Sequence, residues 1–178
     1  DKQLSRACKM YVDKWDSMKE KGYGILMQGN VGTGKSFFAA CIANAVIEKG
    51  SKTYFITAPE IVAVANDFSQ YGDDRRWEVS SKIKSVDLLI IDDLGAERNT
   101  SFGVEAIYNA VNDRYETGKT TIVTTNLSEE EMAKPHNTSE ERIFDRVLEM
   151  CPLTFLADGQ PRRKESRHDR RSAASDLL

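Results

Sequence analysis

The sequence predicts a three-layer α/β fold, with helices on both faces of a five-stranded, mostly parallel sheet. Three observations support this prediction. Five short segments rich in apolar or β-branched residues alternate with segments of helical periodicity. One of these, Val86–Asp92, is almost continuously apolar, as expected for a strand covered on both faces. A glycine-rich loop, Gly29–Ser36, lies between the first such segment and a helical one.

The composition is that of a soluble globular domain. The chain has 178 residues, of which 40% are hydrophobic and 30% charged, enough for one domain with a sizeable core. No apolar run approaches a membrane span and no secretory signal opens the chain, so we expect a cytoplasmic protein without a membrane partner. Cys8, Cys41 and Cys151 are far apart, which favours reduced thiols over disulfides or zinc.

The first elements follow from periodicity and stop signals. Apolar residues at helical spacing predict a leading amphipathic helix over 1–21, which Gly22 ends. Residues 24–28 are the first strand, and a helix of about four turns follows the glycine loop. The β-rich run Thr53–Thr57 is the second strand.

Residues 58–84 are predicted to form two inserted helices. Thr57 and Glu60 form a capping box, with Pro59 in the first turn of the first helix. Residues 71–74 break the pattern, and the second helix is expected from Arg75. The remaining elements are the strand at 86–92, a helix ending at Gly118, a strand at 120–125, two short helices capped by Ser128–Glu131 and Thr138–Glu141, and a final strand at 153–156.

Residues 1–160 therefore form one predicted domain, followed by a basic tail over 161–178. Between Arg162 and Arg171, six basic residues face two acidic ones, although the net charge of the chain is −3. The chain begins at Asp1 rather than at a methionine, so we expect a fragment that lacks an N-terminal partner-binding domain.

The loop Gly29–Ser36 reads G-N-V-G-T-G-K-S and matches the phosphate-binding pattern G-x-x-x-x-G-K-[ST] at every fixed position. Its glycines allow successive N–H groups to face one anion, and the following helix adds its positive end. Lys35 can reach the β- and γ-phosphates, and the Ser36 hydroxyl can ligate Mg²⁺. A glycine-rich turn that binds nothing is the alternative, which the strand–loop–helix context disfavours. We expect ATP and Mg²⁺ as cofactors, with contacts from Gly29, Asn30, Val31, Gly32, Thr33, Gly34, Lys35, Ser36 and Phe37.

Two acids, Asp92 and Asp93, end the predicted third strand. In an open α/β sheet this edge binds ligands, and the glycine loop lies on the same edge. Asp92 is suited to hold Mg²⁺ opposite Ser36, and Asp93 to orient and deprotonate the attacking water. The alternative is that both acids only cap the turn into Leu94.

Four segments together carry a family resemblance. The chain resembles the AAA+ ATPases of the DnaC/DnaI helicase-loader group, and the related transposon-associated IstB ATPases, from about residue 5 to the final strand. The matching segments are Gly29–Ser36, Leu88–Glu97 (L-L-I-I-D-D-L-G-A-E), Thr124–Asn126 and Glu141–Arg146 (E-R-I-F-D-R). The resemblance implies a P-loop NTPase with an AAA+ core and the sheet order 5-1-4-3-2.

The resemblance also implies further catalytic residues. Asn126 takes the sensor-1 position, which contacts the γ-phosphate or the lytic water, although an Asn after a strand is also an ordinary turn residue. Arg142 and Arg146 share one helix face, where the family places an arginine finger that enters the neighbouring subunit. Arg146 is the first choice and Arg142 the second. Alternatively, both pair with nearby acids on a solvated surface.

Departures from the family pattern add two expectations. Asp93 stands where many AAA+ proteins have Glu, so hydrolysis is expected to be slow. Too little chain follows the final strand for a full C-terminal lid domain, so the sensor-2 role falls to Arg162 or Arg163, or is missing. Arg162 is the predicted nucleotide contact.

The inserted helices have two interpretations. Arg75, Arg76, Lys82 and Lys84 lie near Trp77 and Tyr71, a composition suited to the backbone and bases of single-stranded DNA. In the other interpretation Trp77 packs in the core and the basic residues are merely solvated.

The leading functional hypothesis is an ATP-hydrolysing loader of a replicative DnaB-type helicase, which self-associates through its ATP site and contacts single-stranded DNA. An IstB-type ATPase subunit of a transposition system is the nearest alternative. A nucleotide-dependent adaptor with little hydrolysis is another. A small-molecule kinase is disfavoured, because the paired acids and Asn126 suit water as the acceptor.

Overall fold

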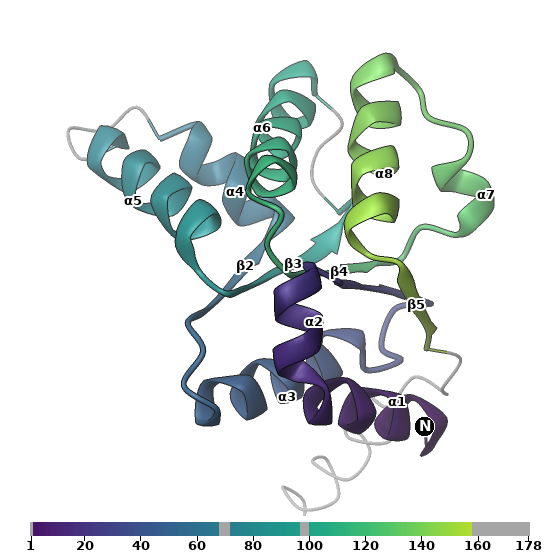
Figure 1. The fold of residues 1–178 in the computed structure, drawn as a ribbon. Helices are drawn as coiled ribbons and strands as arrows, with labels where there is room; N and C mark the ends of the chain where they lie inside the picture. Colours follow the sequence, from purple (N-terminus) through teal and green to yellow (C-terminus); the bar gives the residue numbers. More distant parts are fainter. Residues whose placement is uncertain (1, 68–71, 97–99, 158–178) are drawn as a thin grey trace, which may run out of the picture.

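A computed structural model describes residues 2–67, 72–96 and 100–157 (Figure 1). Within them, one sheet is formed by β1 (Ile25–Gln28), β2 (Thr53–Thr57), β3 (Leu88–Leu94), β4 (Thr121–Thr125) and β5 (Leu153–Leu156). Its strand order is β2-β3-β4-β1-β5, and all neighbouring pairs are parallel. Read from the other edge this is 5-1-4-3-2, so the predicted fold class and strand order are confirmed.

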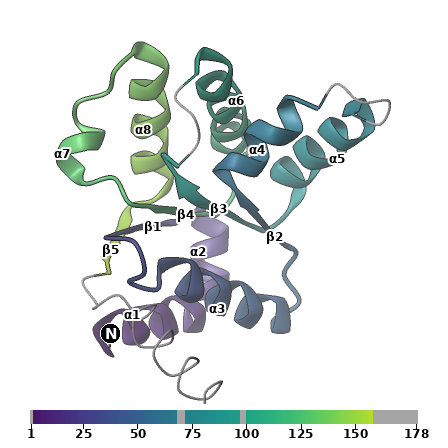
Figure 2. The same ribbon diagram turned by 180° about the vertical axis from the view of Figure 1, so that it is seen from behind.

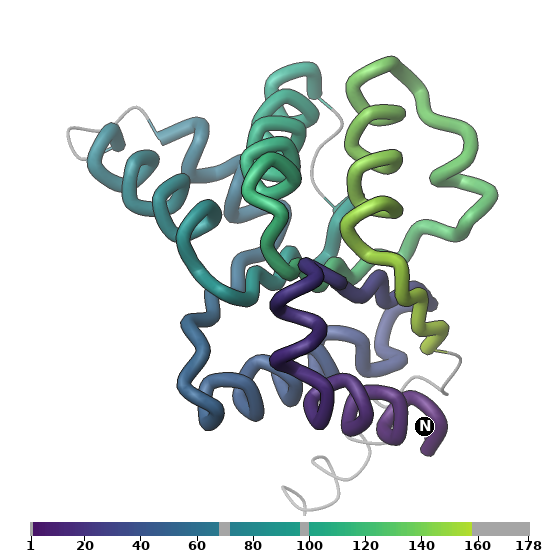
Figure 3. Tube along the Cα trace, in the orientation of Figure 1, coloured from purple at the N-terminus to yellow at the C-terminus, as the bar shows by residue number. Residues whose placement is uncertain are grey.

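Helices cover both faces of the sheet, as Figures 1 and 2 show from opposite sides. One face is covered by α4 (Ala58–Ala65), α5 (Gly72–Ser85), α6 (Ser101–Thr117) and α8 (Thr138–Met150), with the short α7 (Glu129–Met132) before α8. The other face is covered by α1 (Lys2–Asp13) and α3 (Lys35–Glu48). The path of the chain in Figure 3 shows α2 (Trp15–Lys21) rising from α1 to the sheet.

The core has two halves, one on each face of the sheet. Along β3, Leu89 and Ile91 belong to the half under α6 and α8, whereas Leu88 and Ile90 belong to the half under α1 and α3. All four side chains are fully buried. The continuous apolar run therefore marks a strand covered on both faces, as predicted.

The leading helix differs from its prediction. Residues 1–21 were predicted as a single helix, but two helices, α1 and α2, meet at Lys14. The break turns the chain so that Trp15 is only 1% exposed and its indole N–H donates to the Ser51 hydroxyl at 2.7 Å. Gly22 ends α2 in the left-handed conformation, as predicted.

Two further boundaries were predicted wrongly. Helix α5 begins at Gly72 rather than Arg75. Gly72 lies so close to the Asp67 carbonyl that any Cβ would collide with it. Here the glycine permits a close approach instead of breaking the helix. The N-cap of α8 is Asn137 rather than Thr138, and its side chain accepts from the Glu140 amide at 2.9 Å.

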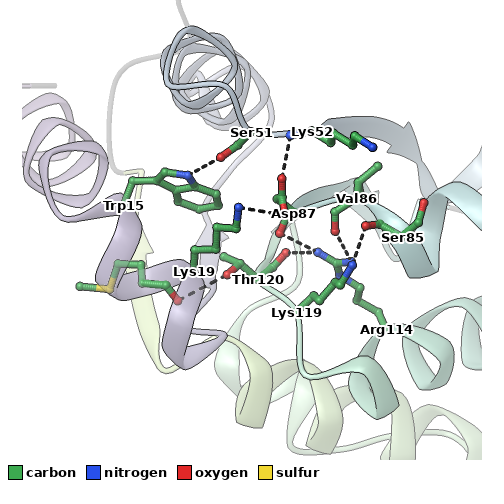
Figure 4. Close-up of polar contacts among 11 residues, drawn as sticks. Trp15, Lys19, Ser51, Lys52, Ser85, Val86, Asp87, Arg114, Lys119 and Thr120 are labelled. Atoms are coloured by element: carbon green, nitrogen blue, oxygen red, sulfur yellow. Dashed lines mark hydrogen bonds and ion pairs between the residues drawn. The ribbon is translucent and has the colours of Figure 1, made fainter.

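The amino ends of the strands are joined by a buried arginine (Figure 4). Arg114 of α6 is inaccessible to solvent, and its guanidinium donates to oxygens of Ile83, Val86, Asp87, Thr120 and Thr121. Burial lowers the pKa of Arg114 to about 10, opposed by the nearby charge of Asp87. Lys19 of α2 pairs with Asp87 at 3.0 Å. Helices α2, α5 and α6 are thus held at the edge of the sheet opposite the glycine loop.

No described helix has the length and apolar character needed to cross a membrane. The three cysteines are free thiols, of which Cys41 is exposed. The predictions of a basic tail and of no full lid domain concern residues 158–178, which lie outside the described residues.

Candidate nucleotide-binding site

The glycine-rich loop connects β1 to α3 at the carboxyl edge of the sheet. Gly29, Gly32 and Gly34 have φ values of 145°, 86° and 101°, which side-chain-bearing residues rarely adopt. A Cβ on Gly29 would also lie 2.5 Å from the Ala157 carbonyl oxygen. Helix α3 begins without a side-chain cap at Gly34, so no side chain covers its first amides. Uncapped amides at a helix N-terminus are the chemistry that binds an anion.

Lys35 links this loop to the end of β4. Its side chain is 5% exposed, and the ammonium donates to the carbonyls of Gly29 at 2.7 Å and Asn30 at 3.0 Å. The same ammonium donates to the Asn126 amide oxygen at 2.7 Å. The residues predicted as the phosphate-binding lysine and as sensor 1 are therefore in direct contact.

The two candidate acids lie at the carboxyl end of β3, as predicted, although the strand extends two residues beyond Asp92, to Leu94. Asp92 is 5% exposed and its Oδ1 accepts from the Thr124 hydroxyl at 2.6 Å. The pairing of β3 with β4 is irregular between Ile91 and Leu94, and Asp93 there has a φ of 56°. Asp tolerates this left-handed conformation better than most residues. The irregularity leaves Asp92 buried and Asp93 half-buried.

The donor set at this edge fits a magnesium ion that is shared with a phosphate. Ser36 is half-buried in the first turn of α3, and Asp92 ends a strand on the same edge. The described residues contain no group of three or more His, Cys, Asp or Glu side chains placed to hold a metal. One hydroxyl and one carboxylate suit Mg²⁺, which keeps several waters and binds substrate phosphates rather than an all-protein cage.

The two arginines of α8 differ in their surroundings. Arg142 is exposed, whereas Arg146 is half-buried with its guanidinium over the rings of Tyr108, at 4.8 Å, and Tyr115, at 5.4 Å. Among the described residues, neither arginine forms an ion pair with an acid of its own helix. The alternative in which the two arginines pair with neighbouring acids is therefore not observed.

Helix α5 exposes its tryptophan. Trp77 is 74% exposed, so the interpretation that placed it in the core is wrong. The basic residues of the helix have acidic neighbours: Arg75 and Arg76 contact Asp67 and Asp73, Lys82 pairs with Glu78, and Lys84 pairs with Asp113. Tyr71 lies outside the described residues, as do Glu97, Arg162 and Arg163.

Two polar residues at this edge received no role from the sequence. Thr124 joins the acids of β3, because its hydroxyl donates to Asp92 and accepts from the Asp93 amide at 3.0 Å. Gln28 ends β1 and is 3% exposed. A polar residue at the end of a predicted buried strand is the signal that marks both positions.

Known proteins resemble this chain over most of its length. The sequence profile of the IstB-like ATP binding protein family matches residues 15–169. The replicative helicase loader DnaC of Escherichia coli K12 is 28% identical over 144 residues, which are 81% of this chain and 56% of that protein. The loader DnaI of Bacillus subtilis is 30% identical over 154 residues, 80% of this chain and 48% of that protein. The chain thus spans about half the length of these relatives.

Solved structures show the same fold. Crystal structures of a DnaC helicase loader and of DnaI match with TM-scores of 0.67 and 0.70, at 24% and 21% identity. Each match covers 86% of this chain, and 86% and 82% of the solved chains. The fold is therefore that of the AAA+ P-loop ATPases. With the profile match across most of its residues, the chain belongs to the family of IstB-like ATP binding proteins.

Proposed function

We propose that this chain is the ATP-binding and ATP-hydrolysing part of a loader for a replicative DnaB-type helicase. The contact between Lys35 and Asn126 is the observation that carries the proposal, because it joins the glycine loop to β4 beside the acids of β3. Hydrolysis of a magnesium-bound triphosphate needs a glycine loop, a lysine, a pair of strand-end acids and an amide at one edge of the sheet.

The loop and Lys35 would bind the triphosphate. The uncapped amides of α3 face the phosphates, and the Lys35 ammonium exchanges its carbonyl and amide partners for phosphate oxygens. Ser36 and Asp92 would hold Mg²⁺, which neutralises the charge that develops on the transferred phosphoryl group.

Asp93 and Asn126 would act on the attacking water. Asp93 accepts a proton from it and Asn126 orients it or the γ-phosphate. The short arm of Asp93 places its carboxylate about one methylene further from the water than a Glu would, so hydrolysis is slow. An arginine from a second copy, Arg146 or Arg142, would supply the missing cation and accelerate hydrolysis about 10³–10⁵-fold. Activity then depends on self-association.

Similarity to the loaders DnaC and DnaI supports a helicase ring as the partner. A structural match to a DnaA initiator bound to AMPPCP and single-stranded DNA, at a TM-score of 0.63, shows the fold alone. The DNA contact is therefore proposed from the exposed Trp77 of α5, which is available for stacking on a base.

A second candidate function is the ATPase subunit of a transposition system. The description of the matching family favours it. So does similarity to a putative ATP-binding protein of a Mycobacterium tuberculosis insertion sequence, which is 26% identical over 155 residues. That match covers 83% of this chain and 60% of the other protein. The full-length protein mixed with a DnaB-type helicase, or with an insertion-sequence transposase, in Mg-ATP separates the two. Co-migration with the helicase alone supports the loader.

ATP turnover measured against chain concentration, with and without single-stranded DNA, tests the enzyme itself. A rate that rises more steeply than the concentration supports hydrolysis at a shared site. Zero turnover at high concentration, with ATP bound, identifies a nucleotide-dependent adaptor instead.

A further inference from the structure

A cavity of about 350 Å³ lies between α7, α8 and the neighbouring ends of β1 and β5. Met132, Phe144 and Leu148 give it an apolar wall. Gln28 also lines it, and its amide nitrogen donates to the Leu127 carbonyl at 3.3 Å. The Gln28 Oε1 atom is buried and accepts no hydrogen bond from the described residues. Because that atom is buried, the apolar wall and the rim decide which side chain can enter the pocket.

The rim of the same pocket is acidic. Glu129, Glu141 and Asp145 line it, and all three are exposed. None of them forms an ion pair within the part of the chain that the structure describes. An apolar wall and unpaired carboxylates together suit a long side chain with an apolar stem and a cationic head, which is arginine or lysine.

Helix α1 offers such side chains on its outer face. Lys2, Arg6 and Lys9 are exposed at helical spacing, and Met10 beside them is 50% exposed. None of the three cations pairs with an acid among residues 2–67, 72–96 and 100–157. The described part of the chain therefore carries two surfaces of opposite charge whose charged side chains form no ion pair within it.

The two surfaces cannot meet within one molecule. Helix α1 lies on one side of the sheet, whereas α7 and α8 lie on the other, as both views show (Figures 1 and 2). A contact between them must join two copies. Both surfaces also flank the proposed shared ATP site: α1 packs against α3, which begins at the glycine loop, and Asp145 is one turn along α8 from Arg142.

We propose that Arg6 of one copy, with Met10 alongside, enters the α7–α8 pocket of the next copy. The guanidinium pairs with Asp145 and Glu141, while Met10 covers the apolar wall. This inference rests on the proposed function and names the surfaces through which copies associate. Seating Arg6 in the pocket brings α8, with Arg142 and Arg146, to the side of the neighbour that carries its glycine loop.

Sedimentation of the 178-residue chain, with and without Mg-ATP, tests the contact. Arg6→Glu is expected to weaken association about tenfold to a hundredfold, because it places like charges together. Asp145→Arg is expected to do the same. The double variant restores the charge pair in swapped order and should associate within about threefold of the wild type. Lys52→Glu, at the amino edge of the sheet, is the matched control and should leave association unchanged.

A crosslink adds a readout that does not depend on affinity. In a Cys41→Ser background, Arg6→Cys combined with Asp145→Cys should give a ladder of disulfide-linked multimers under mild oxidation by diamide. Each single variant alone should stay monomeric under the same oxidation, and a mixture of the two single variants should stop at dimers. The ladder can form only between copies, because the two positions lie on opposite sides of the sheet.

Several results would overturn the inference. One is unchanged association of Arg6→Glu, and another is a double variant no better than its parents. If only Asp145→Arg weakens association, the pocket takes another cationic segment, such as residues 162–171. A chain that binds ATP but stays monomeric at every concentration also refutes it. If calorimetry shows no ATP binding, the proposed function is refuted instead. The contact is then still tested by comparing the association of the variants in the absence of nucleotide.

Discussion

The Thr124 hydroxyl joins the two candidate acids of β3. It donates to Asp92 Oδ1 at 2.6 Å and accepts from the Asp93 amide at 3.0 Å. The Thr124 side chain thus orients the Asp92 carboxylate, which is proposed to hold the metal. It also holds the backbone of Asp93, whose carboxylate is proposed to act on the water. The positions of the two acids are coupled through β4.

Thr124→Val keeps the shape of the side chain and removes both hydrogen bonds. Turnover at saturating ATP is expected to fall about tenfold to a hundredfold, since a hydrogen bond to a charged group contributes about 1.5–3 kcal/mol. Thr124→Ser should recover most of the rate, because it keeps the hydroxyl. Thr53→Val, at the amino end of β2, is the control, because its hydroxyl has no hydrogen-bond partner among the described residues. Equal rates for Thr124→Val and wild type would remove Thr124 from the site.

Lys35→Ala removes the ammonium that the glycine loop surrounds. Triphosphate affinity is expected to fall at least about a hundredfold, or roughly 2.7 kcal/mol. Isothermal titration calorimetry with a non-hydrolysable Mg-nucleotide measures it. Lys52→Ala, an exposed lysine at the amino edge, should bind as the wild type does. Unchanged affinity of Lys35→Ala would contradict the assignment of the loop.

Asp93→Asn tests the proposed base without disturbing the fold. Asn tolerates the left-handed backbone at this position, where φ is 56°, so the variant should keep the melting temperature of the wild type. It should bind ATP and stay assembled, while turnover falls about 10²–10⁴-fold. Single-turnover phosphate release measures the chemical step. Release at the wild-type rate would show that another group acts as base.

Arg146→Ala and Arg142→Ala distinguish the two candidate fingers. The finger variant should bind ATP normally as a monomer and lose about 10³–10⁵-fold in turnover. Arg146→Ala should also lower the free energy of unfolding by about 1 kcal/mol, because its guanidinium no longer packs on Tyr108 and Tyr115. Mixing the finger variant with Lys35→Ala subunits should restore turnover. No recovery in the mixture would argue against action between copies.

Trp77 provides an optical test of DNA contact. The chain has two tryptophans, of which Trp77 is 74% exposed and Trp15 only 1% exposed. Stacking on a base should therefore quench mainly the Trp77 emission when single-stranded oligonucleotide is added. Trp77→Phe should abolish the quenching, and Trp77→Ala should weaken binding by about 1–3 kcal/mol in anisotropy titrations. Quenching that persists in Trp77→Phe would place the contact elsewhere.

The fold was predictable because its signals are local. The glycine loop, the apolar run of β3 and the stop at Gly22 depend on neighbours in sequence, and all three have the expected structure. The break between α1 and α2 at Lys14 was not predictable in this way, because it depends on the hydrogen bond between Trp15 and Ser51, which lie thirty-six positions apart.

The candidate site was predictable as a set of residues but not as a network. The loop motif indicates Lys35, the end of the buried strand indicates Asp92, and the family resemblance indicates Asn126, and the structure places Lys35 and Asn126 in contact. None of these signals shows that Thr124 ties the acids together, since the bond depends on the irregular pairing of β3 with β4. Arg114 was missed for the same reason: its partners lie on four different elements or turns.

The basic surface of α1 and the acidic α7–α8 pocket lie on opposite sides of the sheet, which determines how an assembly of copies can grow. Any open row of subunits joined through them has two unlike ends, one presenting a free α1 and the other a free pocket. Such a row elongates until it closes into a ring or until another molecule occupies one of its two ends. A binding partner that mimics only one of the two surfaces therefore needs to bind only once to set the length of the whole assembly.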